Sequence, residues 1–353
     1  MDRVLSVLVC LVILNGCGSR DAESDSSDLT GTVPAYELSL DREKSISISI
    51  IDTIGSAYGD TAMFGRVTDV DVYGNRIYVL DGRLSALSVF DVHTRSLIKR
   101  TELPGGAGPG EIYDPNQFCM DSNGNSYIRG SDSYIHIFDD ELVFKTRSIY
   151  LATMLLLHAF NTEVFLIPVF TGRTEKPAVE VIDPKGDVVA SFGHQHEDFE
   201  ENWVNNQLQG TIYVFLATDN NLIYLAPALP LLIQTFTHGS YIQKENYTFT
   251  PEYAGKQVES PDGRWMYPTG LITGLCSYTD QELLVFTNDM ESQITYLNLI
   301  NTSERTYIEC NLMEYIGEFI RYVIPASDGE RLYIRQNDPF PHILIMSIEI
   351  NTR

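Results

Sequence analysis

From residue 45 onward, short apolar, β-branched and aromatic runs alternate with Gly, Asn, Asp and Pro. No long segment of the sequence repeats its apolar residues at the period of a helix. Residues 45–51 instead alternate between serine and isoleucine almost throughout, which is typical of a strand with one buried face. This pattern predicts an all-β fold.

One unit of strand, tight turn and strand occurs twice in closely similar form, at residues 71–79 and 121–128. Each copy holds an Asp, a Gly-Asn pair and a Tyr, and a later strand in each ends in Phe-Asp. The Gly-Asn pair allows the positive φ angles of a tight hairpin. Weaker copies follow at residues 161–166, 219–224, 280–285 and 328–333. Recurrence at roughly 40 to 50 residues is typical of propellers, so the six units predict a six-bladed β-propeller with four antiparallel strands per blade.

The strand at residues 45–51 precedes the first unit and has no hairpin partner nearby in the sequence. An open edge strand is a liability that proteins avoid. We therefore expect this N-terminal strand to close the ring by pairing beside residues 343–350.

Residues 105–111 read Gly-Gly-Ala-Gly-Pro-Gly-Glu, and Pro115 and the Asp-Ser-Asn-Gly-Asn run at 121–125 follow. This order resembles the NHL-type and related six-bladed propellers, and the specific match covers about two blades. The resemblance implies the fold and a scaffold role, sometimes an enzyme, and it fixes no one activity. We interpret residues 121–125 as a hairpin turn, because the later bidentate acid of a calcium loop is missing.

Residues 1–16 are predicted to be a signal peptide, because an apolar run too short to cross a bilayer follows Arg3. The run ends in Leu-Asn-Gly before Cys17, which resembles the lipobox of bacterial lipoproteins. That resemblance implies lipidation of Cys17 and anchoring in the cell envelope, with Gly18 favouring the outer over the inner membrane. An ordinary secretory signal is the alternative. Residues 17–40 are predicted to be a flexible acidic and Ser-rich tether, and residues 41–353 the propeller.

The chain carries 48 acidic residues against 24 Lys and Arg, a formal charge of -24. Such a field repels phosphate backbones, which argues against a nucleic-acid partner. The five cysteines lack the close paired spacing of a disulfide framework or a zinc site. The three outside the leader are expected to be buried thiols.

Three groups of residues are candidates for a site. Polar residues expected near the central channel, for a small anionic or polar ligand, are Arg66, Asn116, His158, Gln209 and Arg321. Aromatic residues expected on one loop-rich face, within a long insertion at 237–268, are Tyr241, Tyr247, Tyr253, Trp265 and Tyr267. Weak metal-ligand candidates are His194, His196 and Asp198. The aromatics suit a sugar, peptide or protein contact, and the alternative is that they pack the insertion onto the propeller.

The favoured function is a lipid-anchored envelope propeller that binds an envelope protein, peptide or glycan through one loop-rich face. No catalytic residue is assigned, since the sequence contains neither a Gly-x-Ser-x-Gly elbow nor a His-Glu-x-x-His motif. The alternative is a lactonase-like or lyase-like enzyme that holds a divalent cation in the channel. The favoured function needs no cofactor. An adhesive or assembly subunit of a larger outer-membrane complex would fit the same sequence.

Overall fold

The computed structural model describes most of the chain from residue 33 to residue 353. The segments outside the described part are residues 1–32, 56–62, 133, 150–153, 161–162, 169–176, 184–186, 194–213, 220, 228–230, 255–256, 260–265, 321–322 and 338–339. Across the described residues, no helix is long and apolar enough to cross a membrane.

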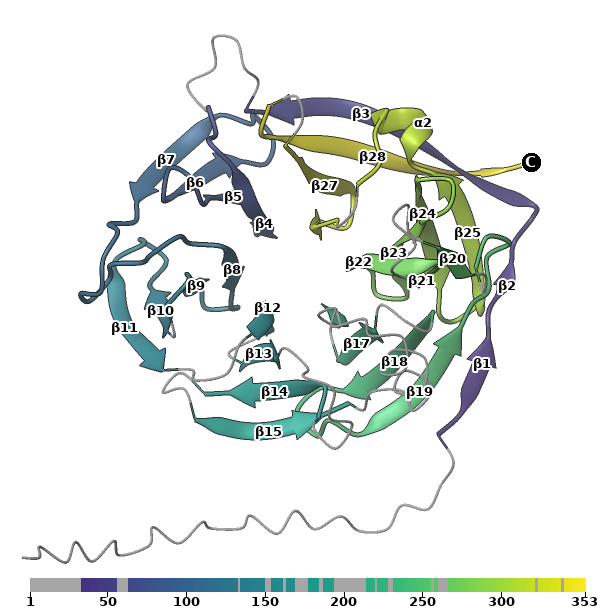
Figure 1. Cartoon of the computed structure of the whole chain (residues 1–353), viewed down its shortest axis with the longest axis horizontal. Coiled ribbons are helices and arrows are strands. Elements are labelled where there is room, and N and C mark those ends of the chain that lie inside the picture. Colours follow the sequence, from purple (N-terminus) through teal and green to yellow (C-terminus); the bar gives the residue numbers. More distant parts are fainter. Residues whose placement is uncertain are drawn as a thin grey trace, which may run out of the picture. The chain divides into compact units, whose positions relative to one another are not determined.

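Six sheets of four or five strands follow one another along the described chain (Figure 1). Sheet 1 holds β4 (Val67–Tyr73), β5 (Arg76–Asp81), β6 (Ala86–Asp91) and β7 (Leu97–Glu102). Sheet 2 holds β8 (Gln117–Met120), β9 (Ser126–Arg129), β10 (Tyr134–Phe138) and β11 (Phe144–Ile149). Sheet 3 holds β12 (Met154–Phe160), β13 (Glu163–Pro168), β14 (Val179–Ile182) and β15 (Val188–Phe192).

The other three sheets each include a strand from the N-terminal part of the chain. Sheet 4 holds β16 (Val214–Asp219), β17 (Leu222–Pro227), β18 (Leu232–Thr237), β19 (Gln243–Thr248) and β1 (Ala35–Glu37). Sheet 5 holds β22 (Leu271–Thr279), β23 (Glu282–Asp289), β24 (Ile294–Asn301), β25 (Thr306–Asn311) and β2 (Ser39–Leu40). Sheet 6 holds β26 (Pro325–Ser327), β27 (Arg331–Gln336), β28 (His342–Thr352) and β3 (Lys44–Ile54). A two-stranded sheet, β20 (Gln257–Glu259) with β21 (Met266–Pro268), and helix α2 (Met313–Ile316) complete the described elements.

The innermost strands of the six sheets surround a common centre (Figure 1). In chain order, β4, β8, β12, β16, β22 and β26 each contact the next, and β26 contacts β4. Sheets placed radially around an axis, each with two neighbours, form a β-propeller. The predicted all-β propeller fold is therefore confirmed.

Apolar side chains on both faces of the sheets hold neighbouring sheets together. On β5, Ile77 and Val79 pack toward sheet 6, whereas Tyr78 and Leu80 pack toward sheet 2. Similar clusters join sheets 2 and 3, sheets 4 and 5, and sheets 5 and 6. A strand that is buried on both faces needs a continuous apolar run, which explains why Ile-Tyr-Val-Leu occurs here.

Aspartates organise the hairpins that the sequence analysis identified. The carboxylate of Asp121 accepts hydrogen bonds from the backbone N–H groups of Asn123 and Asn125, both at 2.9 Å. Gly124 has a φ of 80°, which residues with a side chain rarely adopt. The hydroxyl of Tyr127 also donates to Asp121, at 3.0 Å. The prediction of a hairpin turn at 121–125 is thus confirmed. The same kind of bond joins the Tyr333 hydroxyl to Asp328, at 2.7 Å, in the last unit.

The N-terminal segment binds the outer strands of two sheets before it enters a third. β1 pairs in parallel with β19, and β2 pairs in parallel with β25. Leu38 between them is buried in the core, and the Arg305 guanidinium lies over the Tyr36 ring at 3.5 Å. Residues 35–40 are therefore part of the folded unit, which corrects the expectation that the tether extends to residue 40.

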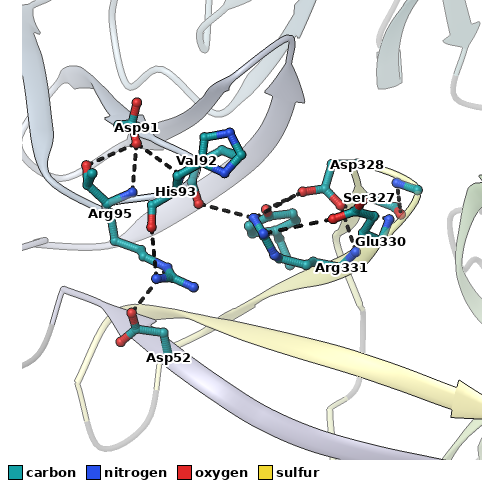
Figure 2. Close-up of polar contacts among 12 residues, drawn as sticks. Asp52, Asp91, Val92, His93, Arg95, Ser327, Asp328, Glu330 and Arg331 are labelled. Atoms are coloured by element: carbon teal, nitrogen blue, oxygen red, sulfur yellow. Dashed lines mark hydrogen bonds and ion pairs between the residues drawn. The ribbon is translucent and has the colours of Figure 1, made fainter.

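β3 pairs antiparallel with β28 along its full length, with Ile48 opposite Ile348. Side chains also connect sheet 6 to sheet 1 at this point (Figure 2). The Arg95 Nε lies 3.3 Å from a carboxylate oxygen of Asp52 on β3, and Arg331 donates to the Val92 carbonyl at 3.2 Å. The first and last sheets are thus joined by ionic and hydrogen-bonded contacts as well as by apolar packing.

The strand directions place the loops at two ends of the sheets. Because successive strands are antiparallel, the connections between sheets and the loops between second and third strands lie at the same end. We call this end the connection face; its described segments on sheets 6, 1 and 2 are residues 63–66, 82–85, 103–116, 130–132, 337 and 340–341. The other end, the turn face, carries residues 74–75, 92–96 and 121–125.

Ile48 provides a test of how much the β3 contacts contribute to stability. Ile48 is 5% exposed within the cluster between sheets 5 and 6, whereas Ile50 on the same strand is 44% exposed. Replacing a buried Ile with Ala removes apolar contacts and leaves a cavity, so Ile48→Ala is expected to lower the free energy of unfolding by about 2 to 4 kcal/mol. The matched change Ile50→Ala is expected to cost about 0.5 kcal/mol or less. Urea unfolding monitored by Trp fluorescence gives both values, and equal losses would contradict the assigned burial.

Candidate functional site

A cavity of about 840 Å³ lies at the centre of the ring. Residues of all six innermost strands line it, together with Arg66, Asp114 and Asn337 from the connection face and Arg335 from β27. Three of the residues expected near the channel, Arg66, Asn116 and His158, line this cavity. The other two, Gln209 and Arg321, lie outside the described residues.

Arg66 is at the rim of the cavity on the connection face, half-exposed, with its guanidinium 2.8 Å from the Asp114 carboxylate. Asn116 lies next to it along the wall, and its side-chain oxygen is buried without a hydrogen-bond partner among the described residues. The rim therefore combines an ion pair with an amide oxygen that has capacity to accept a hydrogen bond.

Two aspartates on β4 dominate the wall, and the sequence analysis did not identify them. The carboxylate of Asp69 accepts the N–H of Val70 on its own strand and the N–H of Phe118 on β8, both at 2.9 Å. Asp71, two residues further along, accepts from Val72 at 2.8 Å and from Met120 on β8. The alternation of a strand places both carboxylates on one face, so together they bridge sheet 1 to sheet 2.

Burial changes the proton affinity of both carboxylates. Burial raises the pKa of Asp69 to about 7, against the opposing effects of the Phe118 N–H and the Arg335 guanidinium. Burial raises the pKa of Asp71 to about 6, against the N–H groups of Val72 and Met120. Loss of water around a carboxylate disfavours its charged form, so these two groups exchange protons near neutral pH.

His158 connects three further sheets on the other side of the cavity. Its Nε2 lies 3.1 Å from the Thr218 hydroxyl on β16, and the Ser277 hydroxyl on β22 donates to the Thr218 carbonyl at 2.8 Å. Burial lowers the pKa of His158 to about 4, so the imidazole is neutral at pH 7. A neutral imidazole here offers a hydrogen bond rather than a positive charge to a ligand.

Arg335 and Cys119 complete the wall. The Arg335 guanidinium donates to the backbone carbonyl of Thr68 at 2.6 Å, which joins sheet 6 to sheet 1. Burial raises the pKa of the Cys119 thiol well above its usual value, which keeps it protonated. Cys119, Cys276 and Cys310 are free and buried, as expected from their spacing.

Asp81 fixes the loops on the connection face of sheet 1. This fully buried carboxylate accepts the N–H groups of Gly65 at 2.6 Å and Arg66 at 3.1 Å, from the connection that precedes β4. It also accepts the N–H groups of Arg83 at 3.0 Å and Leu84 at 2.9 Å, from the β5–β6 loop. One side chain therefore locks two loops to each other, and a sequence signal was available in the Asp-Gly pair that ends β5.

The aromatic residues of the predicted insertion serve packing where they are described. Residues 243–248 are the outer strand β19 rather than a loop, and Tyr247 on it is buried in the core. Tyr241 lies in the β18–β19 turn, on the turn face, and stacks on Phe192 with ring centroids 5.1 Å apart. The expectation that Tyr241 and Tyr247 lie on the loop-rich face is therefore wrong, because residues 243–248 form a strand of sheet 4 and Tyr241 lies in the turn before it.

Tyr253 does lie after β19, beyond the strand end that reaches the connection face. It stacks on Tyr296 of β24 with ring centroids 4.4 Å apart, and its hydroxyl bonds to that of Thr287. Tyr253 therefore packs its segment onto the propeller, as the alternative interpretation of the aromatic residues expected. Trp265 lies outside the described residues, and of Tyr267 only the backbone in β21 is described.

The weak metal candidates His194, His196 and Asp198 lie outside the described residues. Within the described part of the chain, no three His, Cys, Asp or Glu side chains converge as metal ligands would. The Gly-rich segment 105–111 folds around its own glutamate, since Glu111 accepts the Gly108 N–H at 2.7 Å.

The raised pKa of Asp69 predicts a specific pH dependence of stability. A carboxylate with a folded pKa near 7 and an ordinary unfolded value near 3.8 stabilises the fold fully below pH 3.8, and this contribution is lost as the pH rises to about 7. The difference in unfolding free energy between wild type and Asp69→Asn should therefore fall with rising pH, by up to about 1.4 kcal/mol per pH unit.

Urea unfolding of both proteins from pH 4 to pH 7 measures this difference. His158 acts in the opposite direction, because its lowered pKa favours the fold as the pH rises from 4 to 6.5. Both proteins retain His158, so its contribution cancels in the difference. Asp140→Asn, at an exposed turn carboxylate, serves as the matched control. A pH-independent difference for Asp69→Asn would contradict the assignment.

Comparisons with known proteins show similarity in fold. No family model matches the chain, and no curated protein matches it. One similar solved structure is a Bacteroides fragilis protein whose name describes it as exported, at 13% identity and a TM-score of 0.59 over 91% of this chain and 100% of that one. Another is an aldose sugar dehydrogenase with bound PQQ from Streptomyces coelicolor, at 11% identity and a TM-score of 0.51 over 86% and 99% of the chains. At these identities the likeness concerns the fold alone, and that fold is the β-propeller.

Proposed function

We propose that the protein is a lipid-anchored cell-envelope propeller that binds a protein or peptide partner through its connection face. In this proposal each of the six sheets is one blade, and the pair of β3 with β28 closes the ring. Anchoring is through Cys17, with the outer membrane favoured over the inner, and the lipobox-like sequence supports it.

The observation that carries the binding role is the pair of loops held by Asp81. Binding costs less when the contacting loops are already ordered in the free protein. Residues 65–66 and 83–84 are fixed by four backbone hydrogen bonds to one buried carboxylate. Loops on a rigid scaffold are also where binding sites usually lie. The cavity is a weaker candidate, because Asp69, Asp71, His158 and Arg335 are already bonded to neighbouring sheets.

Crosslinking in intact cells tests which face meets the partner. A photo-activated phenylalanine analogue is placed at Ser131 or Glu291 on the connection face, and at His93 or Glu330 on the turn face; all four positions are exposed. We expect one crosslinked product shared by the first two positions and absent from the other two, detected by immunoblotting. Products from the turn face only, or none at all, would contradict the proposed face.

The anchor is tested separately with Cys17→Ala. Without a thiol at this position no acyl chain can be attached, and two or more chains are what hold a protein stably in a membrane. We expect the variant to leave the membrane fraction and appear in the soluble fraction after cell lysis, while the parent stays with the membrane. A variant that stays with the membrane like the parent would contradict anchoring through Cys17, and a parent that is soluble like the variant would indicate an ordinary secretory signal.

A further inference from the structure

Four large apolar side chains are exposed on the connection face of three successive sheets. Phe340 is 46% exposed in the β27–β28 loop of sheet 6, and Met63 is 57% exposed in the segment before β4. Leu84 is 48% exposed in the β5–β6 loop, and Tyr113 is 53% exposed in the connection from sheet 1 to sheet 2. Contiguous exposed apolar surface on a soluble domain marks an interaction site.

Close contacts place these loops side by side. A Cβ on Gly55 would lie within 2.5 Å of the Phe64 ring and 3.3 Å from the Pro341 carbonyl oxygen, so Gly55 fits between the loops that carry Met63 and Phe340. A Cβ on Gly65 would lie 3.1 Å from Leu84. Glycine is therefore required at Gly55, where φ is also 95°, and a side chain at Gly65 would have to displace its neighbours by a few tenths of an ångström.

The contact continues from sheet 1 to sheet 2. A Cβ on Gly82 would lie 2.7 Å from the Pro115 carbonyl oxygen and 2.8 Å from the Arg66 guanidinium. The Tyr113 carbonyl in turn accepts the Ser131 N–H at 2.7 Å. We call the surface formed by Met63, Leu84, Tyr113, Phe340, Arg66 and Arg83 the apolar strip. Its backbone is fixed by Asp81 at one point and by Ser131 at another.

The strip does not share the acidic excess of the whole chain. The protein has a net charge of -24, yet segments 63–66, 81–84 and 113–116 contain Arg66 and Arg83 against two aspartates, Asp81 and Asp114. Asp81 is buried under four N–H groups, and Asp114 is paired with Arg66. The Arg83 side chain is exposed and bonds to no other described residue. Phe, Tyr, Met and Arg are the residues enriched in the core of protein interfaces.

We propose that the apolar strip binds an extended segment of another protein in which acidic and apolar side chains alternate. The proposal rests on the proposed function and names its partner class. Apolar side chains of the segment contact Leu84 and Tyr113, and its carboxylates pair with Arg83 and, by exchange with Asp114, with Arg66. A membrane surface is the competing occupant, and flotation with anionic vesicles, described below, tests it.

Binding of designed peptides to the full chain in detergent tests this. Three fluorescein-labelled dodecapeptides alternate Glu with Leu, Lys with Leu, and Glu with Ser, and fluorescence anisotropy measures binding at physiological ionic strength. We expect the Glu-Leu peptide to bind and the other two to bind at least about tenfold more weakly, as expected when buried apolar and charged anchors dominate affinity.

Substitutions then locate the binding site. Arg83→Glu and Leu84→Ser should each weaken Glu-Leu binding by about tenfold or more, and Arg83→Glu should strengthen Lys-Leu binding. The matched controls Lys244→Glu and Ile242→Ser, both at exposed positions on sheet 4 away from the strip, should leave it unchanged. Circular dichroism melts of all four variants show whether the fold is retained.

The remaining outcomes overturn the proposal in separate ways. Loss of binding in the control variants as well would show a contact outside the strip. Flotation of the protein's Cys17→Ala form with anionic vesicles, abolished by Leu84→Ser, would assign the strip to a membrane. If no peptide binds but Ser131 still forms a crosslink, the strip is not the docking surface, although the partner does meet the connection face. If neither the peptide binds nor the crosslink forms, the proposed binding function is wrong as well.

Discussion

The innermost strand of each sheet has one edge without a neighbouring strand, and that edge faces the axis of the ring. Backbone N–H and C=O groups left unpaired there would be costly where water is limited. Side chains of the adjacent sheet supply the missing partners. Asp69 and Asp71 accept backbone N–H groups of β8, and Arg335 donates to the backbone carbonyls of Val67 and Thr68 on β4. The presence of Asp69, Asp71 and Arg335 in the cavity wall follows from this need.

The same need explains why two carboxylates tolerate burial. Each one exchanges hydration for two backbone N–H donors, which recovers part of the cost of leaving water. The recovery is incomplete, and the pKa values of Asp69 and Asp71 rise to about 7 and about 6 as a result. A raised pKa in a cavity is often evidence for catalysis. Here a structural role accounts for it without any substrate.

The sequence was sufficient to predict the propeller because its signals are local. Hairpin turns need Gly-Asn, strands buried on both faces need continuous apolar runs, and both recur at a fixed interval. The pairing partner of residues 45–51 was also predictable, because a strand without a hairpin partner nearby in the sequence needs a distant one, and β3 does lie beside β28. β1 and β2 were missed because three-residue and two-residue strands have no periodicity to detect.

The candidate site was harder to predict, for a physical reason. Whether an Asp on a strand faces the axis depends on a register shift between Val67 and Asp69, which no pattern of apolar residues reveals. Tyr247 was assigned to a loop because β19 reads Gln-Lys-Glu-Asn-Tyr-Thr, a polar run that forms a strand only through pairing with β18. Long-range contacts decided both cases.

Hydrogen bonding differs between the central cavity and the connection face. In the cavity, the polar side chains that bridge neighbouring sheets are occupied by backbone groups or by one another, so a ligand must compete with the bonds that hold the ring together. On the connection face, Asp81 satisfies the backbone of two loops and leaves the side chains of Arg83 and Leu84 exposed. A partner that contacts these side chains breaks no bond of the fold. Binding at the rim is therefore compatible with the stability of the propeller in a way that binding against the cavity wall is not.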